Sequence, residues 1–351
     1  MGINLNMSLW YNYLICIVMI AGGVTLLIKC SDMFVDASSY FAKKLKIPPL
    51  IIGLTIVAFG TSMPELAVSA SDSIACLVNG GNANIAIGNV IGSNICNILL
   101  VLGFSIFLAP LTVKKDILKF EFPIMIIVSV VASLFILFFS LNGTYAILRW
   151  EGAILIIGII AYVSYLVIKS KRQHNPKELQ HTTDVESLKF DDMGYLKATI
   201  VLILGLAGVI IGGEFVVNGA KSVAIGIGDL AGLNHDLVES LVGLTIVAVG
   251  TSLPELVTTI VAAKKGENEI AIGNVIGSNI FNVLFVLGIG SVINPLTIGS
   301  QVIIDLAVML VATIVCYVLA LNKTLSKKEG LAFILCYVAY VTYLVLRTVL
   351  L

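Results

Sequence analysis

Two glutamates stand in almost the same short motif in separate halves of the chain. GLTIVAFGTSMPE occupies residues 53–65 and GLTIVAVGTSLPE occupies residues 243–255, with two differences in thirteen positions. A second pair follows each motif in the same order, IAIGNVIGSNICNILLVLG at 85–103 and IAIGNVIGSNIFNVLFVLG at 270–288. Repetition of this kind indicates an internal duplication.

The polar residues of these blocks are all oxygen donors. Thr61 and Ser62 precede Glu65 by four and three residues, so on a helix the three side chains share one face. The second block adds Ser93 and Asn97 at the same four-residue spacing. The other half repeats the set with Thr251, Ser252, Glu255, Ser278 and Asn282. Such a set suits hard cations such as Ca2+ or Na+ and argues against zinc or copper.

Each motif also contains a proline that must interrupt its helix. Pro64 has no N–H and its ring crowds the carbonyl four residues earlier, so we expect a break near Gly60 and, by the same reasoning for Pro254, near Gly250. The break frees backbone carbonyls. In hydrocarbon, such groups are tolerated only where they line a polar cavity or find partners.

The elements that carry these motifs are predicted to span a membrane. Hydrophobic residues make up 58% of the 351 residues, charged residues 12%, and the mean hydropathy is +1.05. A bilayer core needs about 20 mostly apolar residues per helical span. Ten segments of this kind can be delimited, at residues 10–41, 48–74, 84–108, 119–140, 147–168, 196–227, 237–263, 269–292, 301–321 and 330–351. The prediction is an all-α polytopic membrane protein with ten transmembrane helices.

The duplication divides these helices into two groups of five. Because five is odd, the second copy must enter the membrane from the opposite side, which makes the pair an inverted repeat with its substrate site near the midplane. We expect a first five-helix repeat at 1–168, a linker at 169–195, and a second, inverted repeat at 196–351.

Basic residues predict the orientation. Of the 21 Lys and Arg residues, 17 lie in alternate breaks between the spans, including the linker, or at the span ends that border these breaks. By the positive-inside rule that side is cytoplasmic. The chain is therefore expected in the cell membrane, with both termini outside and the central linker in the cytoplasm.

A structural role for the glutamates must be weighed against a functional one. Lys29 could pair with Glu65, but the matching position in the second half is Ile211, so pairing cannot explain why both halves keep the glutamate. Intramembrane carboxylates are by default functional.

For several other residues of the motifs, span ends and linker, we prefer a structural role to an ion-binding one. Two GxxxG pairs, Gly88/Gly92 and Gly273/Gly277, are interpreted as helix-packing positions. Three carboxylates near span ends are interpreted as interfacial, although an entrance role stays open: Asp32, Asp36 and Glu214. The charged stretch 169–194, with His174 and His181, is interpreted as a solvated linker, and a regulatory cation site there is the alternative.

GTSMPE and GTSLPE, each followed by GSN-x-x-N, resemble the paired repeats of the cation/Ca2+ antiporter superfamily, and the chain is most similar to prokaryotic sodium/calcium exchangers. The resemblance implies that spans two, three, seven and eight hold the site and that spans one and six slide across them. It also implies a ligand set for the transported ions: Glu65, Glu255, Thr61, Thr251, Ser93, Ser278, Asn97, Asn282, the carbonyls of Ala58 and Ala248, and, more weakly, Ser62 and Ser252.

The sequence departs from several relatives, which carry Asp where this chain has Asn282. Only two formal charges then face the ions, enough to neutralise one Ca2+. We expect Na+ and Ca2+ to bind as competing substrates, with no cofactor, no enzymatic activity and no nucleic-acid partner. A proton-coupled Ca2+ exchanger of the same fold and a channel remain alternatives, and the oligomeric state is left open.

Overall fold

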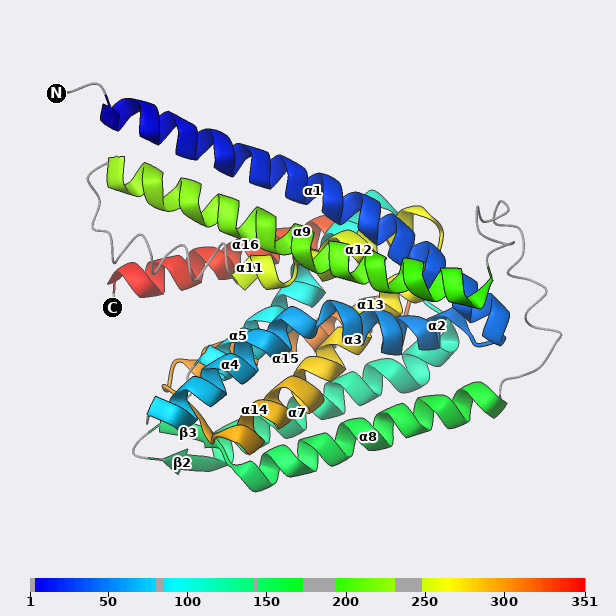
Figure 1. The fold of residues 1–351 in the computed structure, drawn as a ribbon. Coiled ribbons are helices and arrows are strands. Elements are labelled where there is room, and N and C mark those ends of the chain that lie inside the picture. The colour runs from blue at the N-terminus through cyan, green and yellow to red at the C-terminus, as the bar shows by residue number, and fades with distance from the viewer. Residues whose placement is uncertain (1–3, 80–84, 142–143, 173–193, 231–247, 351) are drawn as a thin grey trace.

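Two very long helices lie against each other and form a layer on one side of the molecule (Figure 1). In the computed structural model, which describes residues 4–79, 85–141, 144–172, 194–230 and 248–350, these helices are α1 (Asn4–Leu45) and α9 (Tyr195–Leu230). Their most apolar stretches are only 22% and 28% buried. In these stretches most residues are therefore not buried inside the protein.

The second predicted span is a bent helix. It runs through α2 (Pro49–Ile52), a π-helical turn η1 (Gly53–Val57), α3 (Ala58–Thr61) and α4 (Met63–Asn79), and the two parts meet at 45°. The described part of the seventh span consists of α11 (Ala248–Thr251) and α12 (Leu253–Lys264). The predicted residues 237–247 of that span lie outside the described residues.

The third and eighth spans form the centre. The third comprises α5 (Ile85–Cys96), η2 (Asn97–Leu102) and α6 (Gly103–Leu108), and the eighth comprises α13 (Asn268–Phe281), η6 (Asn282–Leu287) and α14 (Gly288–Ile293). The most apolar stretch of each is 78% buried. Among the eight candidate spans in the described residues, the two that carry the second repeated block therefore have the most buried apolar stretches.

Four further helices surround this centre. They are η3 (Ile117–Glu121) continued by α7 (Phe122–Phe138), then α8 (Arg149–Arg172), α15 (Val302–Ala320) and α16 (Lys327–Leu350). All lie within a few residues of the predicted spans. Among the described residues, eight helices are long and apolar enough to cross a membrane, or nine if the bent pair counts as one span. The protein is thus an all-α polytopic membrane protein.

Short strands connect helix ends, which the sequence analysis did not anticipate. β1 (Leu111–Thr112) pairs antiparallel with β5 (Thr324–Leu325), and β2 (Phe139–Leu141), β3 (Thr144–Ile147) and β4 (Leu296–Ile298) form a three-stranded antiparallel sheet. Two of these pairings join segments from different halves of the sequence. They fasten the loops of the two halves to each other.

Close helix packing explains one of the predicted glycine pairs. A Cβ atom on Gly277 would lie 2.6 Å from the Ala58 Cβ and 2.9 Å from the Leu54 backbone, and one on Gly273 would lie 2.9 Å from the Leu50 carbonyl. The eighth span therefore touches the backbone of the second span directly. For Gly88 and Gly92 no described atom lies within 4 Å of the added Cβ, so the structure does not test that pair.

Candidate functional site

Three of the predicted side chains, those of Thr61, Ser62 and Glu65, lie at or just after a helix break. α3 ends at Thr61, Ser62 has φ −82° and ψ 6°, and α4 begins at Met63. The break is two residues later than expected from Pro64, because the Ser62 N–H still donates to the Ala58 carbonyl at 3.1 Å. Ser252 repeats this geometry, with φ −88° and ψ 6°, between α11 and α12.

Glu65 lies at the start of α4 and is completely buried. The Ser93 hydroxyl donates to its Oε1 at 3.4 Å, and Thr251, at the end of α11, also interacts with the carboxylate. Its Oε2 atom has no hydrogen-bond partner among the described residues. Hydroxyls of both halves thus interact with this carboxylate.

Glu255 occupies the corresponding place at the start of α12 and is also completely buried. The Ser62 hydroxyl donates to its Oε1 at 3.2 Å, and Thr61 and Ser278 interact with the same carboxylate. Within the described chain, Oε2 again lacks a partner. The two carboxylates lie close enough for their charges to interact.

The Thr61 hydroxyl connects the second and eighth spans. It lies 3.1 Å from Asn274 Oδ1 and 3.5 Å from the Ser278 hydroxyl. The Ala58 carbonyl faces the same place, 3.5 Å from Ser278 Oγ, although the Ser62 N–H already uses one of its acceptor positions. For Ala248 the structure gives only its position as the first residue of α11.

Asn97 and Asn282 each begin a π-helical turn, η2 and η6. Both are completely buried. Asn97 Nδ2 donates to Asn279 Oδ1 at 3.5 Å, and Asn282 Nδ2 donates to Asn94 Oδ1 at 3.1 Å. Their own Oδ1 atoms have no partner in the described part of the chain. π-Turns inside α-helices occur frequently at functional sites.

Five buried oxygens of the predicted set therefore lack partners within the described residues: Glu65 Oε2, Glu255 Oε2, Asn97 Oδ1, Asn282 Oδ1 and Ser252 Oγ. Buried polar atoms without hydrogen bonds are costly and rare. The two amide oxygens, and the two glutamate oxygens when the carboxylates are ionised, can accept but not donate, and a cation would satisfy them. We call the residues around these atoms the oxygen cage; they are Thr61, Ser62, Glu65, Ser93, Asn97, Thr251, Ser252, Glu255, Ser278 and Asn282.

The donor atoms of the oxygen cage favour hard cations over zinc or copper. Its donors are carboxylate, amide and hydroxyl oxygens, which hard cations prefer. No group of three or more His, Cys, Asp or Glu side chains able to hold a metal occurs in the described residues. Because only two carboxylates contribute, the cage neutralises two positive charges.

Lys29 does not pair with Glu65. Lys29 is exposed on α1, whereas Glu65 is completely buried and is contacted by hydroxyls. A structural ion pair therefore does not account for the glutamate.

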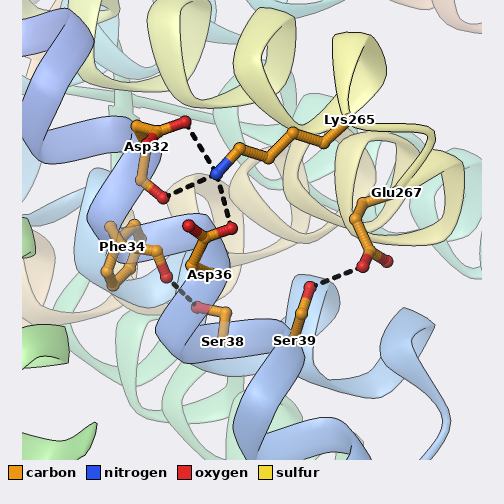
Figure 2. Close-up of polar contacts among 7 residues, drawn as sticks. All are labelled: Asp32, Phe34, Asp36, Ser38, Ser39, Lys265 and Glu267. Atoms are coloured by element: carbon orange, nitrogen blue, oxygen red, sulfur yellow. Dashed lines mark hydrogen bonds and ion pairs between the residues drawn. The ribbon is translucent and has the colours of Figure 1, made fainter. Parts of the chain in front are cut away.

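Asp32 and Asp36 do not belong to the oxygen cage. They lie in the C-terminal part of α1, where both contact Lys265 (Figure 2). Both bind Lys265, which follows α12, with Nζ–Oδ1 distances of 2.7 and 2.5 Å. Beside them, the Ser39 hydroxyl donates to Glu267 Oε1 at 2.8 Å. These contacts fasten one end of α1 to the turn between α12 and α13, which the interfacial interpretation of the two aspartates did not anticipate.

Glu214, the third of these carboxylates, is exposed on α9. It accepts a hydrogen bond from the Asn218 amide at 3.3 Å.

Sequence reasoning missed four asparagines next to the cage: Asn89, Asn94, Asn274 and Asn279. Asn89 Nδ2 donates to Ser69 Oγ at 3.0 Å, and Asn274 Nδ2 donates to Thr259 Oγ1 at 2.9 Å. The signal was present, because each of the four is an amide repeated at the same place in an otherwise apolar block.

Comparison with known proteins gives consistent relatives. The chain is 31% identical over 351 residues to the sodium/calcium exchanger MaX1 of Methanosarcina acetivorans, covering 92% of this chain and 96% of that protein. It is 35% identical over 317 residues to the inner membrane protein YrbG of Escherichia coli, covering 89% of this chain and 91% of that protein. A solved structure of the sodium-calcium exchanger NCX_Mj, soaked with zero Na+ and Ca2+, superposes with a TM-score of 0.75 at 30% identity over 94% of this chain and 99% of that one.

The match to a family covers both halves. Residues 15–170 and 197–346 match the family described as sodium/calcium exchanger protein, and these ranges contain the bent spans and all residues of the oxygen cage. With this match, the chain belongs to the sodium/calcium exchanger family of cation/Ca2+ antiporters.

Proposed function

We propose that the protein exchanges Na+ for Ca2+ by alternating access, with the oxygen cage as the shared site for both ions. The observation that carries this proposal is the group of buried oxygens that have no hydrogen-bond partner among the described residues, four of them in pairs from equivalent positions of the two halves. One Ca2+ would neutralise Glu65 and Glu255, so Na+ and Ca2+ compete for the same charge. Competition for one cage is what couples the two fluxes.

The proposed architecture has ten helices in two inverted five-helix repeats, at residues 1–168 and 196–351, with a cytoplasmic linker at 169–195. Both termini would face outward, and the cage would lie near the midplane. The matching places of Glu65 and Glu255, each three residues after the helix break at Ser62 or Ser252, support this arrangement. The low burial of α1 and α9 supports their role as the helices that slide across the core.

Flux in liposomes tests the exchange. Proteoliposomes loaded with Na+ and placed in Na+-free medium containing Ca2+ should accumulate Ca2+, and collapse of the Na+ gradient should stop the uptake. Uptake that follows an imposed pH gradient and ignores Na+ would instead favour the proton-coupled alternative. Conductance in planar bilayers at rates beyond a carrier would favour a channel.

The contacts of Lys265 yield a prediction about the sliding helix. Lys265→Gln removes the ion pairs to Asp32 and Asp36, of which the Asp36 pair is the more sheltered, with side-chain exposures of 25% and 11%. Because exposed ion pairs contribute roughly 0–1 kcal/mol, we expect backbone amides of residues 32–45 to exchange hydrogen a few-fold faster, as measured by mass spectrometry.

Lys264, the exposed last residue of α12 and the neighbour of Lys265, provides the control. Lys264→Gln removes one positive charge at the same end of α12 and should leave exchange in residues 32–45 unchanged. Equal exchange rates in both variants would show that Lys265 does not hold α1 on the core.

A further inference from the structure

Four buried amides meet at the centre of the protein, two of which belong to the oxygen cage. Asn97 and Asn282 contribute free Oδ1 atoms to the cage, while Asn94 and Asn279 lie one helical turn earlier and are 1% and 2% exposed. Each cage amide bonds to the noncage amide of the other half. The four side chains therefore form two crossed pairs.

An amide has one acceptor end and one donor end, and its orientation decides which end a neighbour meets. Asn97 and Asn282 would offer cations a repulsive NH2 group if either amide were turned by 180°. What prevents this turn is an acceptor placed behind the NH2 group. Asn279 Oδ1 takes this place for Asn97, and Asn94 Oδ1 takes it for Asn282, at 3.5 and 3.1 Å.

Two buried methionine sulfurs set the orientation of the Asn94 and Asn279 amides. Asn279 Nδ2 lies 3.6 Å from Met125 Sδ on α7, and Asn94 Nδ2 lies 3.9 Å from Met309 Sδ on α15. A thioether accepts hydrogen bonds but cannot donate them, so it favours the NH2 end. Asn94 Nδ2 also donates to the Asn279 carbonyl at 3.3 Å, which fixes the same orientation.

We propose that Asn94 and Asn279 are positioning residues that keep the amide oxygens of Asn97 and Asn282 turned toward the bound cation. They touch no ion themselves. Each acts through the cage amide of the opposite half, and the methionines behind them hold the order of donor and acceptor. Outer-shell partners of ligating side chains commonly change metal affinity by roughly 10- to 100-fold.

Asn279→Leu removes the acceptor behind Asn97 with little change in volume. The Asn97 amide then turns freely, and Ca2+ binding to the detergent-purified protein, measured with radioactive Ca2+, should weaken roughly 10- to 100-fold. Met125→Leu, a near volume-conserving change, removes only the sulfur behind Asn279 and should weaken binding in the same direction by a few-fold.

A pair of double variants separates positioning from general damage. In the Asn279→Leu protein, Asn97→Asp supplies a carboxylate that presents oxygen in either orientation, so Ca2+ binding should recover. Asn282→Asp adds the same charge to the cage but leaves the Asn97 amide unsupported. The single variants Asn97→Asp and Asn282→Asp correct for the effect of the added charge on Ca2+ affinity. After this correction, the double variant with Asn97→Asp should bind Ca2+ at least about tenfold more tightly than the double variant with Asn282→Asp.

The corresponding experiment on the other half exchanges the roles of the two Asp substitutions. In an Asn94→Leu protein, Asn282→Asp should restore Ca2+ binding and Asn97→Asp should not. Equal affinities of the two double variants in both backgrounds, or parental affinity in Asn279→Leu and Met125→Leu, would overturn the inference. It rests on the proposed Ca2+ site, but the two fail differently: a parental protein that binds no Ca2+ would contradict the proposed function itself.

Discussion

Replacing Glu255 by Gln should abolish Ca2+ transport while leaving the protein folded. Gln is nearly isosteric with Glu, and the Glu255 carboxylate is held by hydroxyls that an amide oxygen can also accept from. One remaining carboxylate cannot neutralise Ca2+. At an effective dielectric constant of 20, the loss of one charge about 4 Å from the ion costs about 4 kcal/mol or more, which corresponds to about three decades of affinity.

Glu65→Gln should cause a loss of similar severity, because Glu65 has the same burial, the same free Oε2 and the same kind of hydroxyl partners. Ca2+ flux in liposomes and thermal unfolding in detergent should be measured together. A folded Glu255→Gln protein that exchanges Ca2+ at the parental rate would remove the glutamates from the site.

A third buried glutamate provides the matched control. Glu121 is completely buried, but it accepts hydrogen bonds from Tyr162 at 3.0 Å and Lys169 at 2.8 Å, outside the oxygen cage. Glu121→Gln breaks a buried ion pair and should lower thermal stability. Ca2+ affinity should stay at the parental value, because no cage oxygen is changed.

The sequence predicted the helices and the bends because both follow from local chemistry. The apolar lengths gave span limits within a few residues for most helices. The missing N–H of Pro64 predicted a break, which occurs two residues from the expected place because the preceding turn keeps its last hydrogen bond. The repeat then indicated which polar residues of the two halves belong together, since Glu65 and Glu255 occupy the same motif position.

Features that depend on contacts between distant segments could not be predicted. The π-turns that begin at Asn97 and Asn282 have no recognisable signature in a single apolar block. The contact of Lys265 with Asp36 joins residues 229 positions apart. The orientation of the Asn97 amide depends on Asn279, and the orientation of Asn279 depends on the Met125 sulfur on α7.

The pairing of α1 and α9 leads to the second large expected effect, a loss of stability and exchange in Gly23→Val. A Cβ on Gly23 would lie 2.7 Å from the Gly212 carbonyl oxygen on α9, and a Cβ on Gly212 would lie 2.9 Å from the Gly23 carbonyl oxygen. Helices in lipid often associate through such small residues, because these let the two backbones approach closely. Overpacking costs about 1–3 kcal/mol, and here a backbone atom must yield. If α1 and α9 slide as one unit, separating them should lower both the unfolding temperature in detergent and the Ca2+ flux in liposomes.

Gly22→Val makes the same substitution one residue earlier, where no described atom lies within 4 Å, and should leave both measurements near the parental values. Equal behaviour of the two variants would mean that this contact does not hold the two helices together.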